Sequence, residues 1–168
     1  MTTAELLLQD FDIEMANTRR TLERVPEDKP DYKPHEKSMP MGKLTMHVAT
    51  LPKFGTFILT TPSLDLTTAK WPDMIFSSRE KLLADFDALA AEARAALAAA
   101  SDADLATSWK FSFGEHVISN SPRSLAFRHM FFNHLIHHRA QLGVYLRLND
   151  LPVPGVYGPS ADESFNPK

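Results

Sequence analysis

The sequence predicts an all-α fold, a four-helix bundle joined by long connections that contain prolines. Four segments of roughly 20 residues carry apolar side chains at the three- and four-residue spacing of an α-helix. Prolines gather between these segments, and proline is excluded from helix interiors because it lacks an N–H donor. The length of 168 residues suits one hydrophobic core, so we expect a single domain over residues 1–168.

The first two helices are expected over residues 4–23 and 41–59. Thr2 and Glu5 have the spacing of a capping box, in which each side chain binds a free backbone N–H of the other residue. Pro52 lies inside the second helix and should kink it or mark a local break.

The third and fourth helices are expected over residues 79–100 and 122–147. Ser77 and Glu80 have capping-box spacing before the third helix. Ser121 is the expected cap of the fourth, because a proline follows it at the favoured first helical position.

One connection differs from the others in its pattern. Trp109, Phe111 and Phe113 alternate with polar or small residues. Period two is typical of a short extended segment with one buried face. The alternative is a loop that covers the core. Five aromatic residues in the second half of the chain are expected to belong to the hydrophobic core rather than to contact a substrate. They are Trp109, Phe127, Phe131, Phe132 and Tyr145.

Composition excludes several functions. The formal net charge is −3, which disfavours nucleic-acid binding through phosphate neutralisation. The chain has no cysteine, so a disulfide, a thiolate metal ligand and a cysteine nucleophile are excluded. Neither a signal peptide nor a membrane-spanning apolar run is found, so we expect a cytoplasmic protein that binds no membrane.

Histidines are the residues that carry the functional signal. His134 and His138 stand at positions i and i+4 on the inward face of the fourth helix, and His47 faces inward from the second. His129 points elsewhere. One buried histidine is usually a hydrogen-bonded core residue, but three that converge favour a metal ion, with a position left open for water or substrate. Leu135 stands where the zinc-protease motif has its Glu, which argues against that chemistry.

Two stretches of the sequence resemble the DinB-like, or YfiT-like, family of metal-dependent proteins. The stretch Asn133-His-Leu-Ile-His-His-Arg-Ala-Gln-Leu is similar to the family signature N-H-x-x-H-H-R-x-Q, and Lys37-Ser-Met-Pro-Met-Gly-Lys-Leu-Thr-Met-His-Val-Ala matches the region of the remaining histidine. The resemblance covers nearly the whole chain. It implies up-down-down-up helix connectivity and a divalent metal held by His47, His134 and His138.

The resemblance also implies partners and a class of chemistry. Relatives include thiol S-transferases that use bacillithiol and mycothiol-dependent isomerases, and many pair as homodimers. The sequence adds that Leu6, Leu7 and Ile13 widen the apolar surface of the first helix. We therefore expect a homodimer and a small-molecule substrate, with a low-molecular-weight thiol as cosubstrate. Zinc and nickel are the leading ions, followed by iron and manganese.

Three functional hypotheses remain open at this point. The first is an enzyme, a thiol S-transferase or a hydrolase, in which the metal lowers the pKa of a thiol or water. The second is a non-catalytic metal- or ligand-binding module for stress response, and the third is a polar histidine cluster without metal. No catalytic residue beyond the metal ligands can be assigned. Gln141, Asp12 and Glu14 are candidates to orient the ligands, and Arg139 should pair with a neighbouring helix.

Overall fold

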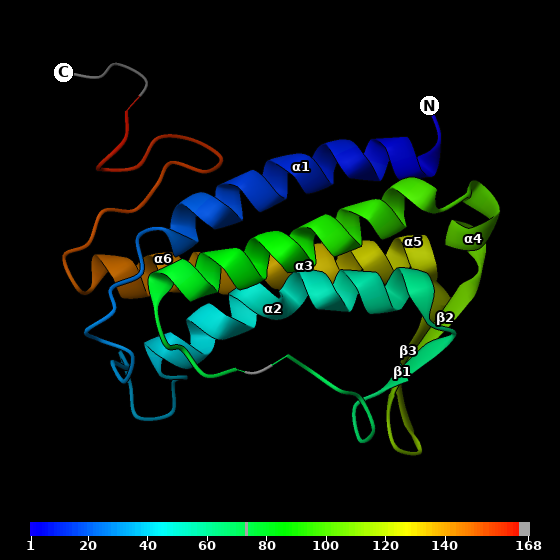
Figure 1. Cartoon of the computed structure of the whole chain (residues 1–168), viewed down its shortest axis with the longest axis horizontal. Coiled ribbons are helices and arrows are strands. Elements are labelled where there is room, and N and C mark those ends of the chain that lie inside the picture. The colour runs from blue at the N-terminus through cyan, green and yellow to red at the C-terminus, as the bar shows by residue number, and fades with distance from the viewer. Residues whose placement is uncertain (73, 165–168) are drawn as a thin grey trace.

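The computed structural model of the chain describes residues 1–72 and 74–164 and shows a mostly helical fold with one small sheet (Figure 1). Residue 73 and residues 165–168 of the predicted domain lie outside the described part. The predicted helices agree with the observed ones to within a residue or so at each end. They are α1 (Thr3–Leu22), α2 (Met41–Thr60), α3 (Arg79–Ala99) and the continuous run of α5 (Arg123–Ala126), η1 (Phe127–Phe132) and α6 (Asn133–Arg147).

One of the three predicted helix caps is confirmed, and two are wrong. The capping box of α1 is confirmed: Thr2 Oγ1 accepts from the backbone N–H of Glu5 at 3.1 Å, and Glu5 Oε2 accepts from that of Thr2 at 2.7 Å. The cap of α3 is Ser78 rather than Ser77. Ser121 does not cap α5, because it belongs to a strand that continues to Pro122. Within α2, the helix runs through Pro52 without a break.

The prediction of an all-α fold is wrong, because the chain also forms a three-stranded sheet. The strands are β1 (Ser63–Asp65), β2 (Ser108–Phe113) and β3 (His116–Pro122), in the order β1-β2-β3. β1 pairs parallel to β2, and β2 pairs antiparallel to β3. A short helix, α4 (Asp102–Ala106), precedes β2 and was also not predicted.

The extended segment expected from the alternating aromatics is β2. Trp109 and Phe111 of this strand are buried, as the period-two pattern predicts. Phe113 is 60% exposed, because the register between β2 and β3 shifts after Phe111. A strand formed here because two large rings could be buried on one face while the backbone hydrogen bonds were satisfied by β1 and β3.

The core lies where the long helices meet. α3 contacts α1 and α2, and α6 contacts the same two helices from the other side. The predicted core aromatics are all buried, which confirms that part of the sequence analysis. Phe11 of α1 packs against the rings of Phe131 and Phe132 at centroid distances of 6.1 and 6.3 Å.

The segment η1 is a turn of π-helix inserted before α6. Wider π-turns are rare and occur often at functional sites. Here the segment buries Phe127, Phe131 and Phe132, contacts α2 and ends directly before Asn133. Thus it sets the rotation with which α6 presents its first residues to α2.

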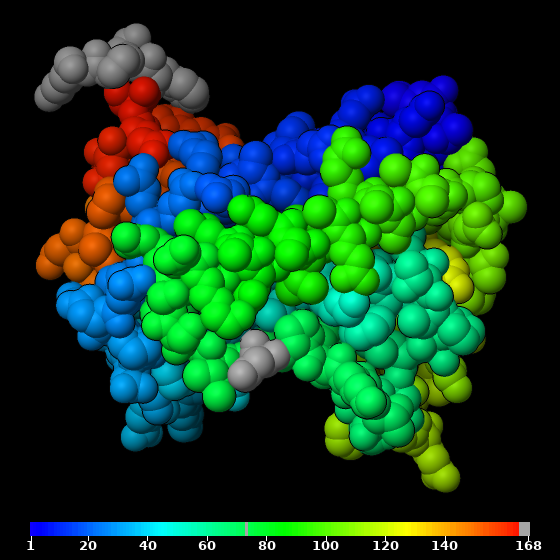
Figure 2. Space-filling view, viewed as in Figure 1, coloured from blue at the N-terminus to red at the C-terminus, as the bar shows by residue number. Residues whose placement is uncertain are grey.

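The remaining observations concern membrane-spanning helices and two segments outside the helical core. In the part of the chain that the structure covers, no helix combines the length and the apolarity needed to cross a membrane. In the connection between β1 and α3, Trp71 and Ile75 are 38% and 72% exposed. The C-terminal segment, in orange and red, passes over the end of α6 and reaches α1 (Figures 1 and 2).

Candidate metal centre

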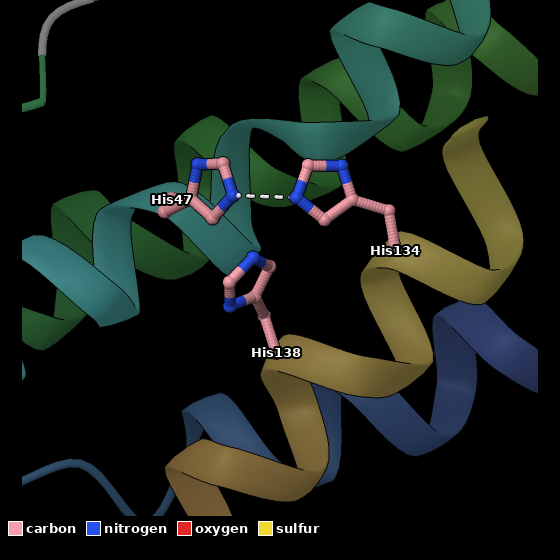
Figure 3. A group of neighbouring side chains, drawn as sticks. All are labelled: His47, His134 and His138. Carbon is pink, nitrogen blue, oxygen red and sulfur yellow. Dashed lines mark hydrogen bonds between the residues drawn. The ribbon is translucent and has the colours of Figure 1, made fainter.

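Three imidazoles meet where α2 faces α6. His47 comes from α2, and His134 and His138 come from successive turns of α6 (Figure 3). The Nε2 atoms of His47 and His134 lie 3.1 Å apart, and one ring nitrogen from each of the three residues lies within 4.8 Å of the others. The structure therefore brings together all three histidines that the sequence singled out, and they are positioned to bind a metal ion.

Helix geometry explains why these histidines meet and others do not. Residues at i and i+4 project from the same side of an α-helix, so His134 and His138 both face α2. All three imidazoles are half-buried. His129 and His137, on other faces of the same helical run, are exposed. The direction predicted for His129 is thus confirmed.

Two of the rings are oriented by hydrogen bonds from outside the cluster. His138 Nδ1 lies 2.7 Å from the side-chain oxygen Oε1 of Gln141. This contact leaves the Nε2 lone pair of His138 free to face the other two histidines. His134 is hydrogen-bonded to the backbone of Met130, one turn earlier. Of the three residues considered for orienting the histidines, Gln141 is thus in contact with one of them.

The two carboxylates considered for the same role lie elsewhere. Asp12 accepts two hydrogen bonds from Arg94 of α3, at 2.7 and 2.8 Å. Glu14 pairs with Arg139, with 2.7 Å between Glu14 Oε2 and Arg139 Nη1. Arg139 was expected to pair with a neighbouring helix, and it does so with α1. Neither carboxylate contacts the histidines, so the expectation that Asp12 or Glu14 orients a ligand is wrong.

The environment keeps the imidazoles neutral. Burial, together with the neighbouring His138, His134 and Lys43, lowers the pKa of His47 to about 4. Burial also lowers the pKa of His134 and of His138, although the hydrogen bonds to Met130 and Gln141 act in the opposite direction. Near pH 7 all three therefore present unprotonated nitrogens, which is the form that binds a metal.

The donor set fits a divalent transition metal. Two nitrogens bound to one tetrahedral ion at 2.0–2.1 Å are roughly 3.3 Å apart, and the observed separation of 3.1 Å for His47 and His134 is close to that value. Imidazole suits zinc, nickel, copper and iron. Three protein ligands leave one position of a tetrahedral ion open.

A cavity of about 440 Å³ adjoins the histidines. Its lining includes Trp71, Met74 and Met130, none of which the sequence analysis connected with the site. Trp71 and Met74 lie in a connection without periodicity, so no sequence signal placed them there. Met130 lies one helical turn before His134, and an apolar residue at that position cannot be distinguished by sequence from ordinary core packing.

Comparisons with known proteins concern the family and the fold. The family model of the DinB superfamily matches residues 10–142. The structure of a DinB-like protein from Bacillus cereus superposes with a TM-score of 0.67 and 24% identity, covering 89% of this chain and 95% of the other. A DinB-like protein from Bacillus subtilis gives a TM-score of 0.69 and 20% identity, with 90% and 97% covered. A search of curated proteins gives no match.

The structural likenesses, at these identities, concern the fold alone. The family model covers most of the sequence, including the stretch in which all three histidines lie. The chain belongs to the DinB superfamily.

Proposed function

We propose that the protein is a metal-dependent enzyme that activates a small nucleophile, a thiol or water, against a small electrophile. His47, His134 and His138 hold one divalent ion in this proposal. The observation that carries it is the convergence of three half-buried imidazole nitrogens within 4.8 Å of one another, beside a cavity of about 440 Å³. A structural metal site would be closed by a fourth protein ligand, and among the described residues the group of metal-binding side chains contains three.

The chain's own residues have defined tasks in this proposal. The histidines hold the ion, and Gln141 fixes the ring of His138 through the contact at 2.7 Å. When bound, the ion lowers the pKa of a thiol or water beside it and makes the anion available near neutral pH. Three neutral ligands leave the charge of the ion uncompensated, which favours an anionic nucleophile. We expect zinc or nickel, with iron or manganese as the next candidates.

The source of the nucleophile follows from composition and from the cavity lining. The chain contains no cysteine, so a thiol must be a separate cosubstrate. Among the described residues, the cavity lining includes no Asp or Glu, so none of these residues provides a carboxylate base there. Thiol transfer is preferred over hydrolysis because of the family resemblance.

The test begins with protein purified without a nickel-affinity step, because a three-histidine site can take up nickel from a column. Bound metal is measured by elemental analysis. The metal-loaded protein is then assayed with 1-chloro-2,4-dinitrobenzene and with p-nitrophenyl acetate, each with and without 2-mercaptoethanol. We expect turnover that requires both metal and thiol.

Each other outcome has a distinct meaning. Activity that survives complete removal of the metal contradicts the proposed mechanism. Turnover that needs metal but ignores thiol identifies a hydrolase. A stably bound metal without turnover favours the alternative, a non-catalytic metal- or ligand-binding module.

Several proposals on organisation accompany this function. The contacts of α1, α2, α3 and α6 support a four-helix bundle with up-down-down-up connectivity that forms one domain. We place the protein in the cytoplasm.

We also propose a homodimer, supported by Leu6 and Ile13 on α1, which are 51% and 58% exposed. Leu7, the third residue of the predicted apolar surface, is instead buried in the core.

A further inference from the structure

The cavity beside His47 and His134 has walls from four separate parts of the fold. Leu51 and Phe54 come from α2, Phe111 from β2 and Met130 from η1. The fourth wall comes from the connection between β1 and α3, which lies along α2 in Figure 1 and contributes Trp71 and Met74. The two histidines complete the lining on one side. Cavities of roughly 300–1,000 Å³ are typical of small-molecule sites, and this one, at about 440 Å³, accepts a small ligand.

The described residues that line this cavity are mostly apolar, and none of them is Asp, Glu, Lys or Arg. Among its described residues, the polar side chains are the two histidines and Thr50. The hydroxyl of Thr50 donates to the backbone carbonyl of Met46 at 2.9 Å and is therefore already satisfied. Away from the histidines, a charged group of a ligand would find no charged partner among the described wall residues and would lose its hydration there. An apolar group of a ligand has no favourable hydration to lose there, and it gains van der Waals contacts with the cavity walls.

Aromatic rings form much of the wall. The ring of Phe54 lies 5.7 Å from Trp71 and 5.2 Å from Phe111, measured between centroids. Such rings provide faces and edges that attract another aromatic ring. Met74 and Met130 add flexible thioether chains, which adapt to ligands of different shape. Trp71 is 38% exposed and stands where the cavity meets the surface.

The surroundings of His138 differ from those of His47 and His134. A second cavity, of about 390 Å³, borders His138 and is lined by Lys37, Ser38 and Gln141 among others. This side offers a cation and hydrogen-bonding groups. The histidines thus border two cavities: a mostly apolar one at His47 and His134, and one of mixed lining at His138.

We infer that the apolar cavity binds the aromatic or branched aliphatic group of the electrophilic substrate, with the reacting end directed at His47 and His134. This inference rests on the proposed function and adds the substrate class to it. The substrate carries an uncharged apolar group of about the size of a benzene ring, and its charged groups, where it has any, stay outside this cavity. Trp71 is the residue at the mouth that sets this preference.

The experiment measures binding rather than turnover. Acetohydroxamate and benzohydroxamate carry the same metal-binding head, and they differ in a methyl group against a phenyl group. Their dissociation constants for the zinc-loaded protein are measured by calorimetry. We expect benzohydroxamate to bind at least tenfold more tightly, which corresponds to about 1.4 kcal/mol. A smaller preference overturns the inference.

Two variants test whether the preference for the phenyl group arises in this cavity. Trp71→Ala should reduce the phenyl preference at least threefold while leaving the affinity for acetohydroxamate unchanged. Phe113→Ala is the matched control, because it removes an exposed ring from β2 that does not line the cavity. This control should keep the full preference. A preference that is equal in Trp71→Ala and in the parent protein contradicts the assignment of the cavity.

A second measurement separates this inference from the metal proposal. Benzyl alcohol, a neutral aromatic without a metal-binding head, is added to the metal-free protein. We expect nuclear Overhauser contacts between its ring protons and those of Trp71 and Phe111. If the protein binds no zinc but shows these contacts, the proposed function fails and the apolar site stands. If it binds zinc but shows no such contacts, the apolar site fails and the metal proposal stands.

Discussion

The Nε2 atoms of His47 and His134 lie 3.1 Å apart, although 87 positions separate the two residues in the chain. Two neutral imidazoles at this distance share a hydrogen bond only when one of them donates. The same separation serves two ligands of one ion, because nitrogens of a tetrahedral site are roughly 3.3 Å apart. The packing of α2 against α6 therefore holds this pair close to a ligand geometry before any ion arrives.

The three histidines should contribute jointly to metal affinity. His47→Ala, His134→Ala and His138→Ala should each weaken zinc binding more than the roughly 10–100-fold loss that follows removal of an outer partner. The measurement is a competition titration with a chelator. His137→Ala is the control, because His137 neighbours His138 on α6 but is exposed. Equal losses in His137→Ala and His138→Ala would show that the ligand assignment is wrong.

Gln141 should support metal binding without being a ligand. Gln141→Leu removes the acceptor that lies 2.7 Å from His138 Nδ1, so we expect zinc affinity to fall about 10-fold or more. Gln141→Glu keeps an acceptor and should retain the affinity. Gln9→Leu on the exposed side of α1 serves as the control for a Gln-to-Leu change. A loss of affinity in Gln141→Glu as large as that in Gln141→Leu argues against the orienting role.

Acid should destabilise the metal-free protein between about pH 6.5 and pH 4. Burial and the neighbouring histidines lower the pKa of His47 to about 4, whereas an unfolded histidine has a pKa of about 6.5. Below pH 6.5, His47 is protonated in the unfolded chain but stays neutral in the folded chain. The free energy of unfolding therefore falls as the pH decreases. The shifts of His134 and His138 have the same direction and add to this effect.

Denaturant unfolding at a series of pH values measures this dependence. His47→Gln should make the stability less dependent on pH in this window, because the substituted side chain does not titrate. His116→Gln, at an exposed position on β3, is the control and should follow the parent protein. A pH dependence that is identical in His47→Gln and in the parent protein contradicts the prediction.

The dimer can be tested through the exposed apolar surface of α1. Leu6→Glu and Ile13→Glu place charges on side chains that are 51% and 58% exposed in the monomer. In a dimer that buries this surface, each change should shift the equilibrium towards the monomer, because a charge without a partner is costly to bury. Light scattering at micromolar concentration measures the change. A parent protein that is already monomeric at that concentration removes the proposal.

The sequence predicted the long helices and the positions of the three histidines because both depend on periodicity. A spacing of three and four residues fixes which side chains share a helix face, whatever the rest of the fold does. His47, His134 and His138 could be assigned to inward faces for that reason. The turn of π-helix at residues 127–132 did not disturb this assignment, because it ends before His134.

The parts that the sequence did not predict depend on contacts between distant segments. β1 has three residues, and it is a strand only because β2 pairs with it. The paired residues, such as Ser63 and Lys110, lie 47 positions apart in the chain. Trp71 lies in a connection with no pattern, and its role as a cavity wall arises from its contacts with Phe54 and Phe57. No local signal marks such a residue.

Arg139 and Glu14 form a buried ion pair that should stabilise the fold rather than take part in the chemistry. Arg139 is 3% exposed, and its Nη1 also donates to the Glu14 carbonyl and to the Thr18 hydroxyl, each at 3.1 Å. Tyr157 of the C-terminal segment donates to Glu14 Oε1 at 2.6 Å. Removing one charge leaves the other buried without a partner, so Arg139→Met should cost about 3–5 kcal/mol of unfolding free energy.

The double variant provides the sharper test of this pair. Arg139→Met combined with Glu14→Leu removes both charges, so it should be more stable than Arg139→Met alone. Arg94→Met, which breaks the exposed pair with Asp12, is the control and should change stability little. Because the pair does not contact the histidines, zinc affinity at a temperature where each variant is folded should match that of the parent protein. A large loss of zinc affinity in the folded double variant would show instead that the pair positions α6 for metal binding.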